Sequence, residues 1–183
     1  MTLSDHVSYS WLAIRRVPKE RALQLLQLAV APASGAEGSE SKRAEFVLAE
    51  SDEGTIIASR NFDFADHAPL EELSAEGELL TCCVHEPLMY SSISNWKTGK
   101  RQWYFFHDGN IGIQHTHIEG EPPAELHTIA NRLMVDQTEG AGLAITVDHV
   151  FEIAPQVAKA LTGFRFDDAI LLAQGESEAL VKL

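Results

Sequence analysis

Features that mark several other classes of protein are absent from this 183-residue chain. No apolar run approaches the roughly 20 residues that a helix needs to cross a bilayer. The segment Met1–His6 is polar and lacks the basic stretch followed by an apolar stretch that marks a secretory signal. We therefore expect a cytoplasmic protein without a membrane partner.

Cysteine is scarce, since the chain has only Cys82 and Cys83, which are adjacent within a predicted strand. Neighbouring strand residues point to opposite faces, so these two thiols are poorly placed to form a disulfide with each other. The sequence also lacks the C-x-x-C spacing of redox sites. Both cysteines are therefore expected to be buried and reduced.

Positively charged residues are few as well. Lys and Arg number 14 against 27 Asp and Glu, which gives a formal net charge of −13. Such an acidic surface repels nucleic acid and attracts basic partners. The same charge also keeps a protein in solution without any specific partner. The composition thus argues against a nucleic-acid partner and leaves a basic protein partner as one alternative.

Familiar catalytic and cofactor motifs are missing. The chain contains no G-x-G-x-x-G, no P-loop, no G-x-S-x-G and no H-E-x-x-H, so we expect no cofactor. His115 and His117 are weak metal candidates, because residues two apart on a strand point the same way. The nearest third ligand, His107, is predicted on the other face of the sheet, so no metal site is expected.

The patterns that are present indicate an α+β fold. Four runs rich in β-branched and aromatic residues span about 78–119 and are separated by turn signals, which predicts a central antiparallel meander. Leu126, Ile129 and Leu133 form an apolar stripe on a helix predicted over Ala124–Asp136. We expect one domain over residues 1–183, with a mostly antiparallel sheet and helices packed mainly on one side. Further expected elements are a strand at Val7–Arg15, a helix from Pro18 whose stripe reaches Val30, a hairpin at Glu45–Ser59, short helices at Pro69–Glu76 and Pro155–Leu161, β-like pieces within Leu143–Ile153, and strands near Ala169–Ala173 and Ala179–Lys182.

The turns also predict which meander residues share a face. With Thr98-Gly99 and Asp108-Gly109 as two-residue turns, Trp96 lies opposite Arg101 and Ile93 opposite Tyr104. One face is then apolar and is expected to lie under the helices; it carries Met89, Ile93, Tyr104, Phe106, Ile111 and Ile113. The other face mixes aromatic rings with short polar side chains; its candidate site residues are Tyr90, Ser92, Ser94, Trp96, Trp103, Phe105 and His107. This mixture is typical of a ligand cleft or a partner interface, although a second core layer or a homodimer seam is also compatible with it.

Four segments carry a resemblance to other proteins: Tyr9–Arg15 (YSWLAIR), Phe62–Asp66 (FDFAD), Met89–Ser92 (MYSS) followed by Trp96, and Ala160–Phe164 (ALTGF). They resemble a group of uncharacterised bacterial proteins of similar length. The resemblance covers most of the chain and implies a bacterial, single-domain protein. Members of the group tend to have acidic residues just before Met-Tyr-Ser, where this chain has His85-Glu86-Pro87. The resemblance implies no activity.

Three functions are compatible with these observations. The first is a non-enzymatic binding or interaction protein, such as an immunity-type protein that blocks a basic toxin. The second is a small enzyme that uses His107 as acid or base together with Tyr90 and the hydroxyls of Ser92 and Ser94. The third is an accessory protein that acts as a homodimer. The missing catalytic motifs favour the first, and we expect homodimerisation to contribute to the cover of the aromatic face.

Overall fold

The computed structural model describes residues 8–31, 44–51, 54–140, 147–165 and 178–183. The strands are β1 (Ser8–Arg15), β2 (Leu28–Val30), β3 (Phe46–Ser51), β4 (Gly54–Ser59), β5 (Glu78–His85), β6 (Tyr90–Lys97), β7 (Lys100–Asp108), β8 (Thr116–Gly120) and β9 (Glu178–Lys182). The helices are α1 (Lys19–Leu26), α2 (Phe64–His67), α3 (Leu70–Glu76), α4 (Ala124–Glu139) and α5 (Ile153–Thr162), with 3₁₀ turns η1 (Glu86–Leu88) and η2 (Val150–Glu152).

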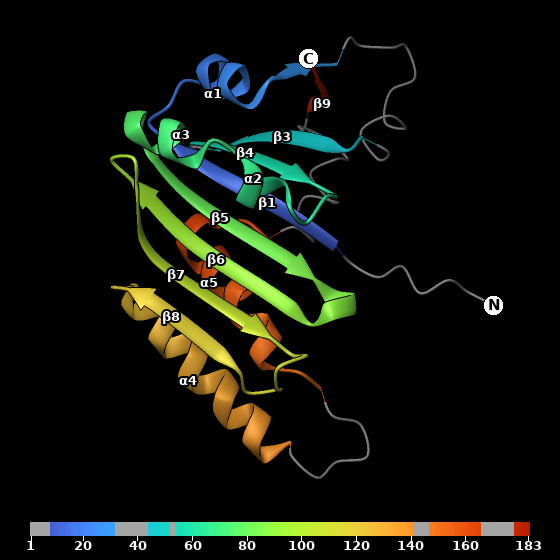
Figure 1. Ribbon diagram of the computed structural model, residues 1–183, viewed down its shortest axis with the longest axis vertical. Helices are drawn as coiled ribbons and strands as arrows, with labels where there is room; N and C mark the ends of the chain where they lie inside the picture. Colours follow the sequence, from blue (N-terminus) through green and yellow to red (C-terminus); the bar gives the residue numbers. More distant parts are fainter. Residues whose placement is uncertain (1–7, 32–43, 52–53, 141–146, 166–177) are drawn as a thin grey trace, which may run out of the picture.

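The described strands form one nine-stranded antiparallel sheet in the order β2-β9-β3-β4-β1-β5-β6-β7-β8 (Figure 1). The predicted α+β class and the meander of β5 to β8 are confirmed. Helices lie on both faces of the sheet. The two longest, α4 and α5, lie behind it in the view of Figure 1, and the shorter α1, α2 and α3 lie in front.

The inner face is defined here as the face covered by α4 and α5. Alternation along the strands places Trp11, Ile93 and Phe105 on this face, where they join one buried apolar cluster with the helices. The predicted stripe of α4 reaches that cluster: Leu126 and Leu133 are buried, and Ile129 is partly buried against it. The helix therefore packs on the sheet as its 3.6-residue periodicity predicts.

The outer face is the opposite one, covered in part by α1, α2 and α3. Its buried cluster joins Leu12, Ile57 and Leu79 of the strands to Leu23 of α1 and Leu73 of α3. These helices contact mainly the β1 and β5 half of the sheet, and α3 reaches only one end of β6 and β7. The outer face of β6, β7 and β8 is therefore left without a described helix over most of its area (Figure 1).

Two local predictions are wrong. The first helix does not extend to Val30, because Gln27 adopts a left-handed conformation (φ 55°) that ends α1 and starts strand β2. The β-like piece predicted up to Ile153 is instead η2 followed by the first turn of α5. The strand predicted near Ala169–Ala173 lies outside the described residues. None of the helices in the described part of the chain is long and apolar enough to cross a bilayer.

Candidate functional site

A β-bulge in the β6–β7 hairpin decides which residues share a face. Trp96 pairs with Arg101 as predicted, but Asn95 then pairs with Trp103, so Gln102 is an extra residue in β7. The side chain of Gln102 holds this irregularity by donating to the carbonyls of Lys97 (3.1 Å) and Lys100 (3.0 Å). Every β7 residue beyond the bulge therefore points to the face opposite to the predicted one.

The predicted aromatic face is consequently divided between two sides. Its β6 members stay together on the outer face: Tyr90, Ser92, Ser94 and Trp96. Its β7 members, Trp103, Phe105 and His107, lie on the inner face and are buried. Conversely, Tyr104 and Phe106, which were predicted beneath the helices, lie on the outer face and are half-buried.

The turn after β7 also differs from the prediction. Asp108 accepts backbone hydrogen bonds from Ile111 and Gly112, and its side chain accepts one from Asn110. These bonds form a loop instead of a two-residue turn, so that His107 pairs with Thr116 and Phe106 with His117. Ile111 and Ile113 were expected in the core, but they are exposed loop residues with 64% and 39% of their surface accessible.

His107 is buried, and both of its ring nitrogens have hydrogen-bond partners. Its Nδ1 lies 2.7 Å from the carbonyl oxygen of His115, and its Nε2 lies 2.9 Å from Oδ2 of Asp148. The same carboxylate accepts a hydrogen bond from the backbone of Phe151, so the pair ties β7 to η2. The expected arrangement of His107 with Tyr90, Ser92 and Ser94 does not occur, because these three residues lie on the opposite face of the sheet from His107.

The outer face of β6 to β8 carries a group of rings that we call the ring platform: Tyr90, Tyr104, Phe106, His115 and His117. Phe106 is at its centre, with ring centroids 5.4 to 6.2 Å from those of the other four. Such spacings are typical of favourable aromatic contacts. The platform residues are half-buried by one another, except His117, which is exposed.

Short hydroxyl side chains lie beside the rings. The phenol oxygens of Tyr90 and Tyr104 are hydrogen-bonded at 3.0 Å. Nearer the turn, the indole of Trp96 donates to Ser94 Oγ (2.8 Å), which is itself 2.7 Å from Thr81 Oγ1. Ser92 Oγ is buried and has no hydrogen bond of normal geometry among the described residues. The small serines leave space for the large rings to lie across the sheet.

Asp66 of α2 supplies a carboxylate beside these rings. Ser10 of β1 fixes α2 in place, because its hydroxyl donates to Asn61 O (2.8 Å) and accepts from Ala65 N (3.0 Å). Asp66 is exposed as a whole residue, but partial burial of its carboxyl raises the pKa of this group, and a hydrogen bond from the Cys83 thiol partly offsets this effect. The negative charge of Asp66 in turn adds to the raised pKa of Tyr90 and Tyr104, for which burial is the main cause.

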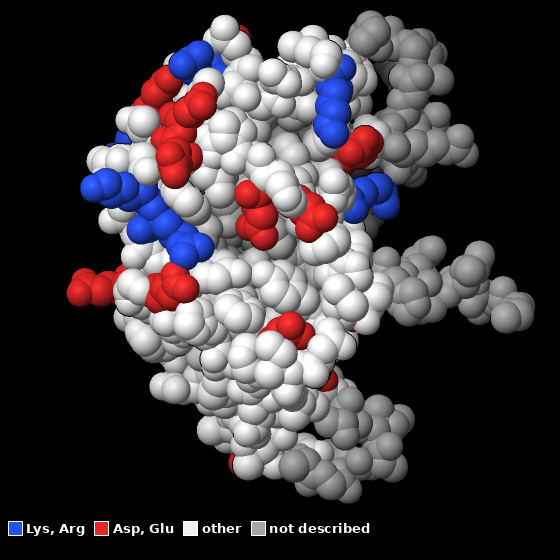
Figure 2. Space-filling view, in the orientation of Figure 1, with Lys and Arg blue, Asp and Glu red and all other residues white. Residues whose placement is uncertain are grey.

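Further charged groups surround the platform. The guanidinium of Arg101 lies 4.7 Å from the centroid of the Tyr104 ring and pairs with Glu119. Glu119 also accepts from His117 Nε2 at 3.0 Å, and both partners lower the pKa of this carboxyl, the bond from His117 most. Figure 2 views this face: the surface over β6 to β8 is mostly uncharged, with acidic side chains around it and cations gathered at the β6–β7 turn.

Metal and thiol chemistry find little support in the described residues. They contain no group of three or more His, Cys, Asp or Glu side chains placed to hold a metal ion. His115 and His117 both contact the ring of Phe106, and they do not converge on a common centre with His107. Cys82 and Cys83 are buried and form no disulfide, and burial raises the pKa of both thiols.

Comparisons of the chain with protein-family models, curated proteins and solved structures find no match. The resemblance to bacterial proteins seen in the sequence therefore stays a prediction. The candidate site is therefore identified from the geometry of its residues alone. Tyr104 and Phe106 were missed as site residues, and the only sequence signal for the bulge that exposes them is the polar Gln102 next to an otherwise apolar run.

Proposed function

We propose that the protein is a non-enzymatic binding protein whose ring platform receives a positively charged segment of a protein partner. The observation that carries this proposal is the half-exposed cluster around Phe106, which no described helix covers and which acidic side chains surround. Aromatic faces attract ammonium and guanidinium groups, and nearby carboxylates strengthen that attraction.

The chain itself contains an example of the expected contact. Arg101 lies over the ring of Tyr104 while its guanidinium pairs with Glu119. A cation of a partner would make the same two contacts, one with an aromatic face and one with a carboxylate. Asp66 and Asp108 lie on the side of the platform away from Glu119, and they supply carboxylates for the second of these contacts.

Long-range electrostatics support the same class of partner. A chain with a net charge of −13 attracts a basic protein from a distance and accelerates the encounter. The same charge opposes the approach of a second copy, which would bring equal charges together. A homodimer that covers the platform is therefore the second alternative, and the experiment below distinguishes the two.

A labelled peptide that carries several Arg and Lys residues tests the proposal by fluorescence anisotropy at low and moderate salt. Phe106→Ala should weaken its binding by at least about tenfold, equivalent to ~1.4 kcal/mol. Ile118→Ala is the matched control, since Ile118 lies on the neighbouring strand, points to the inner side beside Phe105 and is 42% exposed. It should leave the affinity unchanged.

Sedimentation equilibrium on the same samples decides between the two alternatives. A monomer that binds the peptide and loses binding in Phe106→Ala supports the proposal. If the wild-type protein is a dimer without affinity for the peptide, and Phe106→Ala is a monomer, the partner is a second copy of the chain.

A further inference from the structure

A groove on the outer face lies between α1 and α2 and shares no residue with the ring platform. Its volume is about 600 Å³, within the range of roughly 300–1,000 Å³ that is typical of small-molecule sites. The two helices pack mainly on other elements: α1 contacts β2 and α3, whereas α2 contacts β1 and β5. Their separation leaves the groove open above this part of the sheet.

The order of the strands determines what lies at each side of the groove. Leu180, Phe46, Ser59 and Ser10 are successive partners across β9, β3, β4 and β1, so they share the outer face. Lys182 follows Leu180 by two positions and therefore points to the same face. At the other end of this row, Ser10 anchors α2 by accepting from the backbone of Ala65. The groove thus has Lys182 on one side of Phe46 and α2 on the other.

The middle of the groove is apolar. The ring of Phe64, from α2, lies against that of Phe46 with their centroids 5.0 Å apart. Phe46 is buried, but Phe64 is only half-buried and keeps part of its surface open. Leu25 and Leu26 of α1 are also half-buried and line the groove. A ligand that covers this apolar surface removes it from water, which favours binding.

Lys182 supplies a positive charge at the β9 side. Its Nζ lies 5.4 Å from the centroid of the Phe46 ring, and it has no ion pair with a carboxylate in the described part of the chain. Glu178 of the same strand pairs with Lys19 instead. The ammonium group therefore lies beside an apolar groove and can pair with an anion of a ligand.

The α2 side carries the opposite charge. The backbone carbonyl of Asp63 accepts from the backbone of His67 (3.1 Å) and from its Nδ1 (2.8 Å), which fixes the imidazole at the rim of the groove. The carboxylate of Asp63 accepts no hydrogen bond and pairs with no cation among the described residues. This carboxylate repels a second negative charge at the far end of a ligand and accepts a hydrogen bond from a hydroxyl there.

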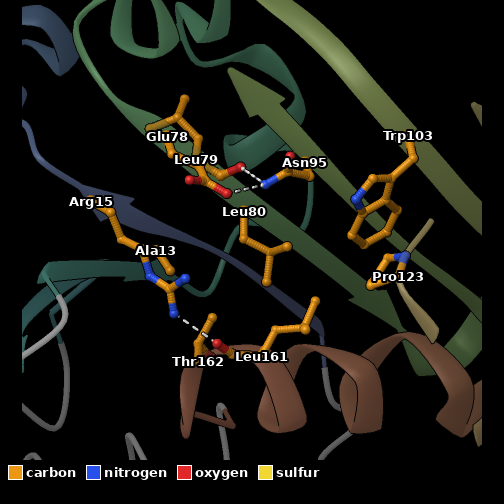
Figure 3. Close-up of a pocket in the computed structure, with 10 residues that line it drawn as sticks. All are labelled: Ala13, Arg15, Glu78, Leu79, Leu80, Asn95, Trp103, Pro123, Leu161 and Thr162. Carbon is orange, nitrogen blue, oxygen red and sulfur yellow. Dashed lines mark hydrogen bonds between the residues drawn. The ribbon is translucent and has the colours of Figure 1, made fainter. Parts of the chain in front are cut away.

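A smaller hollow on the inner face differs in this respect. It has a volume of about 150 Å³ and lies between the sheet and the C-terminal end of α5 (Figure 3). Its two charged residues are already engaged: Arg15 donates to Leu161 O (2.7 Å), and Glu78 accepts from Asn95 (3.2 Å) and pairs with Arg16 (3.7 Å). The groove between α1 and α2 is both larger and better supplied with charges for a ligand.

We infer that this groove binds a monocarboxylate with an apolar chain. The carboxylate of the ligand pairs with Lys182, and its chain lies on Phe64, Leu25 and Leu26. The far end of the chain lies beside Asp63 and is uncharged. A neutral ligand of the same length loses the pairing with Lys182, and a dicarboxylate brings its second charge to Asp63, so both bind more weakly.

The test uses the full-length protein at about pH 8, where an ordinary imidazole is neutral, with octanoate, octan-1-ol and octanedioate as probes. In ¹H–¹³C spectra, octanoate should shift the resonances of Phe64, Leu25 and Leu26, with a dissociation constant on the order of 0.1–1 mM. The other two probes should each bind at least about fivefold more weakly. Octan-1-ol that binds as tightly as octanoate would overturn the pairing with Lys182, and no response to octanoate at about ten times that concentration would overturn the site.

Variants assign the two ends of the ligand. Lys182→Gln should weaken octanoate binding at least about fivefold and leave octan-1-ol binding unchanged, whereas Lys100→Gln, at an exposed lysine of the β6–β7 turn, should alter neither. Asp63→Asn should narrow the difference between octanedioate and octanoate. Equal octanoate affinities of Lys182→Gln and the wild type would contradict the proposal. Phe106→Ala should leave octanoate binding intact, so the groove and the ring platform are tested independently.

Discussion

The phenol hydroxyls of Tyr90 and Tyr104 lie 3.0 Å apart and form a hydrogen bond across β6 and β7. The two residues are not directly opposite each other, because Tyr104 pairs with Ser94 and Tyr90 with Asp108. Phe106 lies between them and contacts both rings. The pair thus closes one side of the platform and holds its rings in a fixed arrangement.

The first prediction concerns the ionisation of these hydroxyls. Burial raises the pKa of both tyrosines above the ordinary value near 10. The unfolded chain therefore loses these protons first, and stability should fall as the pH rises through about 10. As the pH is raised, phenolate absorbance should appear at a higher pH in the folded protein than in the protein unfolded by guanidinium chloride. If all three tyrosines titrated over the same pH range in the folded and the unfolded protein, Tyr90 and Tyr104 would not be a buried pair.

A second prediction separates stability from binding at Asp66. Because burial raises its pKa, ionised Asp66 weakens the fold at neutral pH, and this cost disappears as the pH falls below its ordinary value near 4. Asp66→Asn should therefore raise the melting temperature at pH 7 and lose this advantage at low pH. The same variant should weaken binding of the basic peptide. A variant that melts lower at pH 7 would show that the Cys83 hydrogen bond outweighs burial.

The third prediction concerns the core beneath α4. Leu133 is only 3% exposed, so Leu133→Ala should lower the free energy of unfolding by about 2–5 kcal/mol through lost burial and a cavity. Val135 on the same helix is 55% exposed, and Val135→Ala should have little effect. Urea denaturation of both variants measures the difference. Equal midpoints would place the helix stripe in solvent.

A fourth prediction tests the connection between His107 and Asp148. The carbonyl of His115 can only accept, so Nδ1 of His107 carries a hydrogen, and one proton is shared between Nε2 and the carboxylate of Asp148. Asp148→Ala removes the partner of a buried ring and should cost about 3–5 kcal/mol.

Asp148→Asn should cost much less than Asp148→Ala, because an amide can donate to a neutral imidazole and its oxygen can still accept from Phe151. Asp136→Ala, at a carboxylate of α4 whose side chain is 43% exposed, serves as the control. Equal losses of stability in the Ala and Asn variants would show that charge, and not hydrogen bonding, holds β7 to η2.

Much of the fold follows from periodicity in the sequence. The strands β1, β5 and β6 and the stripe on α4 are confirmed within a residue or two, because apolar alternation and helical spacing are local signals. The site is harder, because it depends on register. A single extra residue, Gln102, transfers Trp103, Phe105 and His107 to the inner face and brings Tyr104 and Phe106 to the outer face.

The bulge also explains a glycine whose role the sequence does not reveal. Gly120 pairs with Trp103 next to the bulge and has φ +74°, where a Cβ would come within 2.1 Å of the carbonyl oxygen of Gln102. Only the assembled hairpin shows this close approach. The β7–β8 loop was likewise misjudged, because Asp108 stabilises a wider turn through its own carbonyl and carboxylate.

NMR observation of the rings themselves tests whether the ring platform binds cationic groups of a partner. Aromatic ¹H–¹³C spectra of the protein should be recorded during titration with an Arg- and Lys-bearing peptide and with the same peptide carrying Gln at those positions. The resonances of Phe106, Tyr104 and His117 should shift with the charged peptide alone, and the shifts should be smaller at high salt. Unchanged platform resonances, or equal shifts with the Gln peptide, would contradict it.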